Sequence, residues 1–556
     1  MPGSLRGLIC LSLASVAVSG LTACGGDDGD DDAVSDATNG GRTGGTITTA
    51  YTSFPDYLDP ALSYTQEGWQ SMWTVYTPLL TYKHEEGAEG ATVVPGLAEA
   101  MPDISDDGRV YKLRLREGLT YSDGTDVKAS DFEHTIKRVL NLQSGGSSFY
   151  QSIEGAERYI DDGRASADIS GIETSDETGD ITITLTEPDG RFPYILAMNF
   201  AAVVPGDTPF ENQTKNPPPG VGPYKFDNVR INRGYDLVKV PAFDVRDQAT
   251  GKLDTITVEV VKNRRRQTQD TIQNKIDYMH DPPAPDQLRD VRARYTGTRY
   301  EEFVTNSTYY YFLNHDVAPF DNAEAREAVN IAIDKRSLAR LFGGLLEPGC
   351  NFLPPGMKGY EKVDPCPWGD PTAAPDVAKA RQLVESSGTA GQAVTVFGND
   401  EPEPRALAEY LSDVLNDIGY KARPRIIEAS VYPTTIGNRK TRAQAGFASW
   451  FQDFPHPGNF MFLVDGDSIQ PTNNQNFGNV NDPEINEILD AASRNADIEE
   501  VADEYARADR LTVEGAHVAA YGHRELTLFY SDRIDFENCT SWHPVYNLDL
   551  TQLCLK

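Results

Sequence analysis

Hydrophobic and polar positions alternate along the chain in two different periods. Alternation at every second residue predicts strands at residues 44–51, 109–116, 180–187, 254–261 and 393–398. An apolar stripe at helical spacing predicts helices at residues 129–140, 321–342, 376–385, 405–418 and 482–494. Ser130 and Glu133 fit a capping box for the first helix, and Asp482 fits the N-cap of the last. The mixture predicts an α/β or α+β body with several layers.

The N-terminal residues have a different pattern. An uncharged apolar run follows Arg6 and ends at Leu21-Thr22-Ala23-Cys24, which predicts a secretory signal peptide over residues 1–23. Its last four residues resemble the bacterial lipobox, in which the cysteine is lipidated and becomes the new N-terminus. A plain signal with a chance cysteine is the alternative. Residues 24–45 are rich in aspartate and glycine, which predicts an extended tether.

Length and charge narrow the class of protein. The 556 residues are enough for two or three domains with a large core. With 84 acidic and 50 basic residues, the formal charge is −34, which disfavours nucleic acid and anionic membrane surfaces as partners. After the leader, no stretch approaches the roughly 20 apolar residues of a membrane span. We therefore expect a soluble body outside the membrane.

Four cysteines follow Cys24, at positions 350, 366, 539 and 554. An even number suits an oxidising compartment. Three pairings are possible, and proximity in the sequence favours Cys350–Cys366 and Cys539–Cys554. The sequence has no CxxC and no HExxH motif, and its eight histidines are scattered. We expect no metal and no cofactor.

Local enzyme motifs are also missing from the sequence. It contains no GxSxG elbow, no Walker A loop and no glycine-rich dinucleotide fingerprint. We therefore expect a protein that is not an enzyme. An extracellular hydrolase stays an alternative, because the carboxylates of glycosidases need no local motif.

Four blocks with distinctive motifs follow one another along the chain. The first runs from residue 76 to 140 and carries the hairpin "LREGLTYSDGTDVKASDF". The others are "GVGPY" at 220–224, "YYYFLNHDVAPFDNAEAREAVNIAIDKRSL" at 309–338 and "SWFQDFPHPGNF" at 449–460. Together they span most of the chain, and in this order they resemble the extracytoplasmic solute-binding proteins of bacterial peptide-type ABC transporters, family 5, which are oligopeptide- or dipeptide-binding lipoproteins.

The resemblance implies an α/β fold of the periplasmic-binding-protein type II kind, with two lobes, a hinge and an extra domain inserted in lobe I. The implied division is as follows: lobe I at 46–80, 191–308 and 520–556, the inserted domain at 81–190, and lobe II at 309–519. A ligand that contacts both lobes would shift the hinge equilibrium towards a closed form.

The function implied by the resemblance is that of a binding protein for an ABC importer. It would capture oligopeptides or dipeptides and deliver them to permease subunits in the membrane. We expect a monomer that is lipid-anchored at Cys24 on the extracytoplasmic side. A non-peptide ligand in the same fold, such as an oligosaccharide or a metal chelate, stays open.

The implied ligand contacts centre on Trp450 and Asp453. In the matching family block, WxxD places a ring and a carboxylate beside the ligand, and the carboxylate meets the peptide's α-amino group. The alternative is that Asp453 caps a turn and Trp450 lies in the core. Tyr309 or Tyr310 is expected to line the cleft. The family takes arginines from the region shortly before Trp450 to meet a peptide's carboxylate, and Arg439, Lys440 and Arg442 lie in that region here. Arg439 is the expected contact, because an arginine suits a bidentate clamp better than a lysine, and a solvated basic turn is the alternative.

One departure concerns the strand that contains these tyrosines. Family peptide binders can carry an acid in this strand, where this chain has Phe312. This difference predicts a more apolar pocket.

Overall fold

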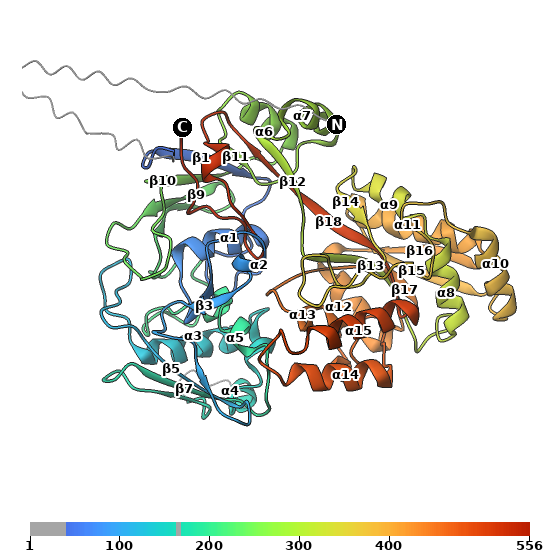
Figure 1. The fold of residues 1–556 in the computed structure, drawn as a ribbon, viewed down its shortest axis with the longest axis horizontal. Helices are drawn as coiled ribbons and strands as arrows, with labels where there is room; N and C mark the ends of the chain where they lie inside the picture. Colours follow the sequence, from blue (N-terminus) through green and yellow to red (C-terminus); the bar gives the residue numbers. More distant parts are fainter. Residues whose placement is uncertain (1–40, 163–167) are drawn as a thin grey trace, which may run out of the picture. The chain divides into compact units, whose positions relative to one another are not determined.

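Strands from both ends of the chain join in one mixed twelve-stranded sheet in the computed structural model of the protein (Figure 1). The structure describes residues 41–162 and 168–556, and residues 41–556 form one compact unit. The predicted signal peptide, Cys24 and most of the predicted tether lie outside the described residues. The order of the sheet is β16 (Lys421–Ile427), β15 (Ala393–Asn399), β17 (Ala445–Phe451), β13 (Ser307–Leu313), β18 (Val518–Tyr530), β11 (Tyr278–Met279), β1 (Thr46–Tyr51), β10 (Thr255–Val260), β9 (Gly234–Lys239) and β8 (Tyr224–Arg230).

The long strand β18 connects the two halves of this sheet. Its first part pairs with β13 and with β14 (Leu346–Pro348), and its second part pairs with β12 (Tyr300–Val304) and β11. Residues 300–313 and 518–530 therefore run antiparallel past each other as two adjacent segments (Figure 1). The predicted lobe boundaries fall within these segments, and the division into lobes stays a prediction.

Three smaller sheets complete the strands. They are β4 (Asp103–Ile104), β5 (Val110–Arg114), β7 (Asp180–Thr184) and β6 (Ile172–Thr174); β2 (Leu80–Tyr82) with β3 (Val93–Pro95); and β19 (Trp542–His543) with β20 (Asn547–Leu548).

Helices follow the strands throughout. They are α1 (Gln66–Val75), α2 (Gly87–Gly90), α3 (Ala129–Asn141), α4 (Ala156–Asp162), α5 (Phe192–Ile195), α6 (Arg264–Ile272), α7 (Pro285–Tyr295), α8 (Ala323–Ala332), α9 (Lys335–Leu341), α10 (Val377–Ser386), α11 (Pro402–Asp417), α12 (Tyr432–Ile436), α13 (Gly458–Met461), α14 (Pro483–Ser493), α15 (Ala502–Glu514) and α16 (Phe536–Cys539). Within the described ranges, no helix is both long and apolar enough to cross a membrane.

The strands and helices predicted from periodicity are confirmed, with two differences in how helices begin. The capping box at Ser130 and Glu133 is wrong: α3 begins at Ala129, and Asp131 accepts the N–H of Lys128 at 2.9 Å. The helix predicted over 321–342 is two helices, since the Asp334 side chain caps a new one. By contrast, Asp482 caps α14 as predicted.

A buried ion pair ties α3 to the segment before α1. The Arg138 guanidinium donates to both carboxylate oxygens of Asp59, at 3.1 and 2.8 Å, and both side chains are fully buried. Arg138 also donates to the carbonyl of Pro209, and Asp59 accepts from the N–H of Gln213. These bonds hold three separate segments together. One of these segments leads into α1, the helix that carries Trp69.

Candidate ligand-binding site

A cavity of about 470 Å³ is walled by segments far apart in the sequence, and we refer to it as the first cavity. Aromatic side chains dominate its wall, which is typical of small-molecule sites. The lining residues are Tyr64, Thr65, Gln66, Trp69, Gly145, Ser148, Phe149, Ser449, Trp450, Phe451, Gln452, Asp453, Phe462, Gln475, Val545, Tyr546 and Asn547. Among these residues of the described chain, Asp453 is the only ionisable side chain other than the tyrosines.

Asp453 lies in the turn between β17 and α13 and is only 6% exposed. Its backbone N–H donates to Oδ1 of Asn459, and Nδ2 of Asn459 donates to its Oδ2, both at 2.8 Å. Burial raises the pKa of the Asp453 carboxyl to about 6, although hydrogen bonds from Asn459 and Tyr64 act in the opposite direction. No lysine, arginine or histidine in the described ranges lies within 4.0 Å of it. A negative charge therefore faces the cavity without a counter-charge.

Trp450 lines the same cavity from the end of β17. Its indole N–H donates to Oδ1 of Asn459 at 3.3 Å, and its ring meets Phe462 edge-on with centroids 5.2 Å apart. The structure thus brings Trp450 and Asp453 together through Asn459. The Asp453 carboxylate accepts a hydrogen bond within the turn and also lines the cavity, and its contact with a ligand's α-amino group stays a prediction.

Sequence reasoning missed Asn459 and Tyr64. Asn459 stands at the end of the recognised block, where an asparagine next to prolines indicates only a turn. Tyr64 lies before α1, stacks on Trp69 with centroids 5.7 Å apart, and has a pKa raised by burial and by the Asp453 charge. No sequence pattern links Tyr64 to Asp453, because the two are joined only by the fold.

Tyr309 and Tyr310 lie in the core on opposite faces of β13. Tyr309 packs against Phe342 and Phe451, and Tyr310 packs against Phe352. They are 9% and 3% exposed, and neither lines the first cavity. A ligand contact for either tyrosine stays a prediction that this arrangement does not support.

Phe312 is fully buried beside Phe477, so it also lies outside this cavity wall. The aromatic character of the cavity comes from other residues, chiefly Trp69, Phe149 and Phe462.

Arg439 lies elsewhere on the surface. Its guanidinium pairs with the Asp316 carboxylate at 2.9 Å, and both side chains are nearly half exposed. It lines a small hollow of about 310 Å³ together with Lys440 and Arg442. The structure does not place Arg439 near Asp453. A contact between Arg439 and a ligand carboxylate stays a prediction.

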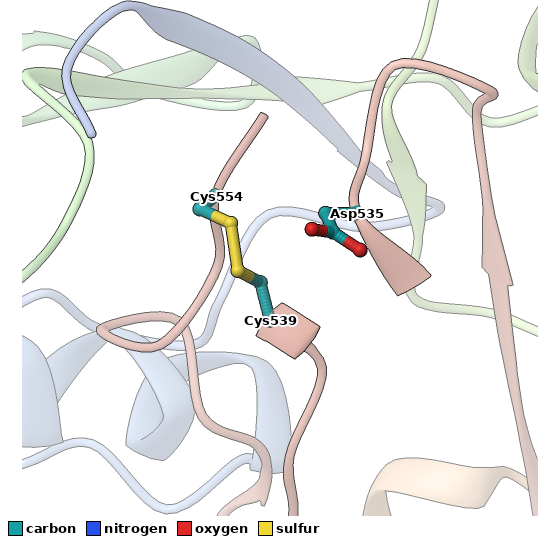
Figure 2. A group of neighbouring side chains, drawn as sticks. All are labelled: Asp535, Cys539 and Cys554. Atoms are coloured by element: carbon teal, nitrogen blue, oxygen red, sulfur yellow. A yellow bond between two sulfur atoms is a disulfide. The ribbon is translucent and has the colours of Figure 1, made fainter. Parts of the chain in front are cut away.

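Two disulfide bonds have the pairing favoured by sequence proximity. Cys539 and Cys554 are bonded to each other beside Asp535 (Figure 2). These three residues lie close enough to hold a metal ion, with their ligand atoms within 4.8 Å. Since metal binding needs free thiolates, and these sulfurs are bonded to each other, the group does not fit a metal.

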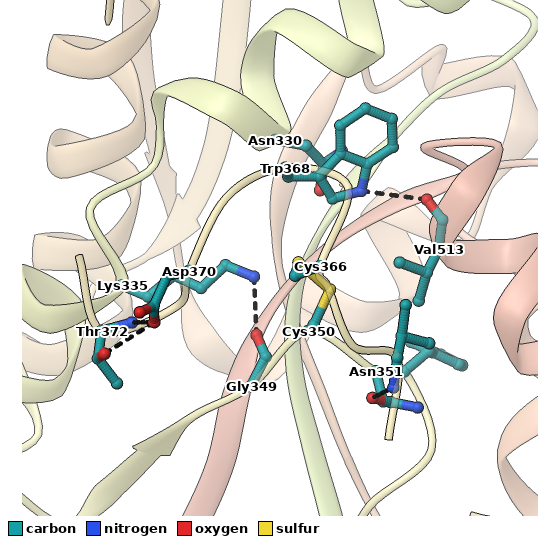
Figure 3. The surroundings of a disulfide bond; sticks show 12 residues. Asn330, Lys335, Gly349, Cys350, Asn351, Cys366, Trp368, Asp370, Thr372 and Val513 are labelled. Carbon is teal, nitrogen blue, oxygen red and sulfur yellow. Dashed lines mark hydrogen bonds between the residues drawn. A yellow bond between two sulfur atoms is a disulfide. The ribbon is translucent and has the colours of Figure 1, made fainter. Parts of the chain in front are cut away.

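Cys350–Cys366 closes a proline-rich loop beside β14 (Figure 3). On one side Nζ of Lys335 donates to the Gly349 carbonyl at 2.7 Å, and on the other the Trp368 indole N–H donates to the Val513 carbonyl at 3.1 Å. Burial lowers the pKa of Lys335 to about 7. Cys350 is buried and Cys366 is half-buried, and the hydrogen bonds on both sides fit a structural bond.

The body is α/β, with a large mixed sheet and an aromatic cavity. The sequence pattern of bacterial extracellular solute-binding proteins, family 5 (middle region), matches residues 92–471. The chain therefore belongs to the bacterial extracellular solute-binding proteins, family 5.

Two of the proteins that are similar to this chain are binding proteins. The chain is 23% identical over 458 residues to the dipeptide-binding protein DppE of Bacillus subtilis (strain 168), covering 80% of each. It is 25% identical over 464 residues to the heme-binding protein A of Haemophilus influenzae, covering 78% of this chain and 79% of that protein.

Solved structures share the fold. The clavulanic acid biosynthesis oligopeptide binding protein 2 has a TM-score of 0.84 at 24% identity, covering 92% of this chain and 96% of that one. The periplasmic binding protein DppA from Helicobacter pylori, in complex with the peptide STSA, has a TM-score of 0.71 at 20% identity, covering 92% and 98%. The predicted fold of the periplasmic-binding-protein kind is confirmed.

Proposed function

We propose that this chain is the lipid-anchored, substrate-binding component of an ABC importer and that it captures oligopeptides or dipeptides outside the cytoplasm. One observation carries the peptide part of the proposal. Asp453 presents a buried carboxylate to the first cavity without a cationic partner in the described chain. An ammonium group taken out of water needs a fixed negative partner, and a peptide's α-amino group provides the complement.

The rest of the cavity suits the remainder of a short peptide. Aromatic walls bury apolar surface, while Gln66, Gln475 and Asn547 offer amide groups for backbone hydrogen bonds. The relatives named for dipeptides and oligopeptides support the same ligand class. We also propose that the protein works as a monomer and hands its ligand to permease subunits.

Calorimetry with a free tripeptide and its N-acetylated form tests the amine contact. The free peptide should bind wild type, and Asp453→Asn should weaken it by roughly 2–5 kcal/mol, the range for truncating one partner of a buried charge pair. The acetylated peptide should bind wild type poorly and lose little more in the variant. Equal affinity for the two peptides would show that Asp453 does not hold the amine, and a non-peptide ligand would then be the better proposal.

A carrier and an enzyme differ in what happens to the ligand. A carrier should bind one equivalent and return it unchanged, and ligand at about 100 times its dissociation constant should stabilise it by roughly 2.7 kcal/mol. Mass spectrometry of the peptide after long incubation checks this. Cleavage that disappears on replacing one carboxylate would favour the hydrolase instead.

A further inference from the structure

Tyr64 reaches the Asp453 carboxylate from a different segment of the first cavity's wall. Its hydroxyl donates a hydrogen bond to this carboxylate. Burial raises the pKa of the Asp453 carboxyl, and this bond acts in the opposite direction. The amide of Asn459 donates to the same carboxylate from within its own turn. The carboxylate is therefore held between a neighbour in sequence and a side chain that only the fold brings to it.

The Tyr64 ring is fixed by its surroundings before any ligand arrives. It stacks on Trp69 with centroids 5.7 Å apart and meets Phe200 edge-on with centroids 5.3 Å apart. Its backbone N–H donates to the Asp56 carboxylate at 2.8 Å. Gly145 lies directly against the ring, since a Cβ at that position would stand 2.5 Å from a ring carbon. These contacts aim the hydroxyl at one place.

Tyr64 is nevertheless open to the cavity, because the residue is 38% exposed. A tyrosine hydroxyl carries one hydrogen to donate and lone pairs that accept. The hydrogen is directed to Asp453, so the oxygen can accept a hydrogen bond from a donor in the cavity. A phenylalanine here would give the same aromatic wall without this acceptor.

A ligand ammonium group beside Asp453 would meet both oxygen acceptors. In an unmodified peptide the α-ammonium group has three N–H groups, so one can donate to the carboxylate and a second to the Tyr64 oxygen. An ammonium group with a single N–H can donate to the carboxylate alone. Hydrogen bonds made by charged groups are the stronger ones, so the missing bond lowers affinity measurably.

We propose that Tyr64 selects ligands by the number of N–H groups on their α-amino group, its oxygen accepting one N–H while its hydrogen stays on Asp453. This proposal rests on the proposed function. It deepens that function by naming the substrate class as peptides whose α-ammonium group keeps at least two N–H groups.

The rest of such a ligand has room away from this pair. A second cavity, of about 760 Å³, adjoins the first one, and Ser148, Phe149 and Phe462 line both. Tyr64 and Asp453 line the first cavity and not the second. Methyl groups placed on the amine therefore probe the Tyr64–Asp453 pair and leave the far end of the ligand unchanged.

The test is calorimetry at pH 7 with Ala-Ala-Ala and with its N-methyl and N,N-dimethyl forms, whose ammonium groups keep three, two and one N–H. Wild type should bind the N-methyl peptide about tenfold tighter than the N,N-dimethyl peptide. In Tyr64→Phe this ratio should fall to near one, because the N-methyl peptide and Ala-Ala-Ala both lose affinity.

Two further variants locate the effect. Tyr546→Phe removes another hydroxyl from the same cavity wall, one that donates to the Ala197 carbonyl at 3.3 Å, and should keep the wild-type ratio. Gly145→Ala should lower the ratio as Tyr64→Phe does, because the added methyl group displaces the ring. Circular dichroism and thermal melts establish that each variant is folded.

The outcomes separate this proposal from the proposed function. A ratio that stays unchanged in Tyr64→Phe would overturn the role of Tyr64 while leaving peptide capture standing. A ratio that falls only because the N,N-dimethyl peptide gains affinity would also overturn it, since the hydroxyl would then act by its bulk. If Ala-Ala-Ala and its N-acetylated form bind equally, the amine contact at Asp453 fails and the role of Tyr64 fails with it. If no peptide binds, both proposals are overturned.

Discussion

At the scale of single residues, the buried carboxylate of Asp453 destabilises the ligand-free protein. In the ligand-bound protein the same carboxylate would compensate the ligand's ammonium group. The Asp453 carboxyl is held in a hydrogen-bonded turn by Asn459, and no cationic side chain of residues 41–162 and 168–556 lies within 4.0 Å of it. A buried charge of this kind disfavours the folded state until a ligand ammonium compensates it. Selection for stability alone would place an amide at this position.

This reasoning predicts how Asp453→Asn changes stability with pH. The folded pKa of Asp453 is raised from 3.8 to about 6, so the folded protein binds a proton more tightly than the unfolded chain. Asp453 should therefore contribute a loss of stability to the wild type as the pH rises from about 4 to 6, and the asparagine variant should lack this contribution. Above pH 7 the variant should be more stable by up to about 3 kcal/mol.

Chemical denaturation of ligand-free protein at pH 4 and pH 7.5 measures this difference. Protein refolded from denaturant ensures that no ligand remains. Asp509, whose pKa burial also raises to about 6, is present in both proteins and cancels in the comparison. A variant that is less stable than wild type by the same amount at both pH values would contradict the prediction.

At the scale of secondary-structure elements, α3 is held by a buried ion pair with the segment before α1. Arg138 and Asp59 are both fully buried and form two hydrogen bonds to each other. Removing one member leaves the other charged and enclosed. Arg138→Met should therefore destabilise the protein by about 3–5 kcal/mol.

The matched control is Arg114→Met in β5. Arg114 pairs with Asp180 at 2.8 Å, but both side chains are about half exposed, so its loss should cost at most about 1 kcal/mol. Denaturant titrations of both variants give the comparison. Similar losses for the two would mean that burial does not set the strength of the Arg138 pair.

The disulfides give a second prediction at this scale. Cys350–Cys366 closes a loop with a sequence separation of 16, and its removal should destabilise the protein by about 3 kcal/mol. Cys350→Ser/Cys366→Ser, with non-reducing peptide mapping of the wild type, checks both pairings. Free thiols or a link between Cys350 and Cys539 would refute them.

Elements with a regular pattern were predictable from the sequence, and elements set by tertiary contacts were not. α14 has an apolar stripe and an aspartate cap, so both its extent and its start were predicted. β18 was missed, because most of it is buried on both faces and Gly522, His523 and Arg524 interrupt the apolar positions. In the site, Trp450 and Asp453 came from a local motif, whereas Tyr64 meets them only through the fold.

At the scale of the whole molecule, segments assigned to different predicted lobes contact one another around the cavities. Phe454 packs edge-on against Phe149 at 6.0 Å, and the N–H of Gly190 donates to the Ser493 carbonyl at 2.8 Å. The adjacent segments around β12–β13 and β18 are the continuous links between these regions. Ligand capture by closure about these links would give a permease one loaded shape to recognise.

The proposed carrier would work only near its permease, so the proposed lipid anchor gives a further prediction. If Cys24 is lipidated, Cys24→Ser should move the protein from the membrane fraction to the medium or periplasm with its ligand affinity unchanged. A single acyl chain binds membranes only marginally, so more than one chain per protein is expected in intact-mass spectra of the wild type. Cys10→Ser, in the same leader, is the control and should leave the protein in the membrane fraction. Retention of the Cys24→Ser protein would show that the leader holds it by other means, and the lipobox interpretation would fail while ligand capture would still stand on the measurements at Asp453.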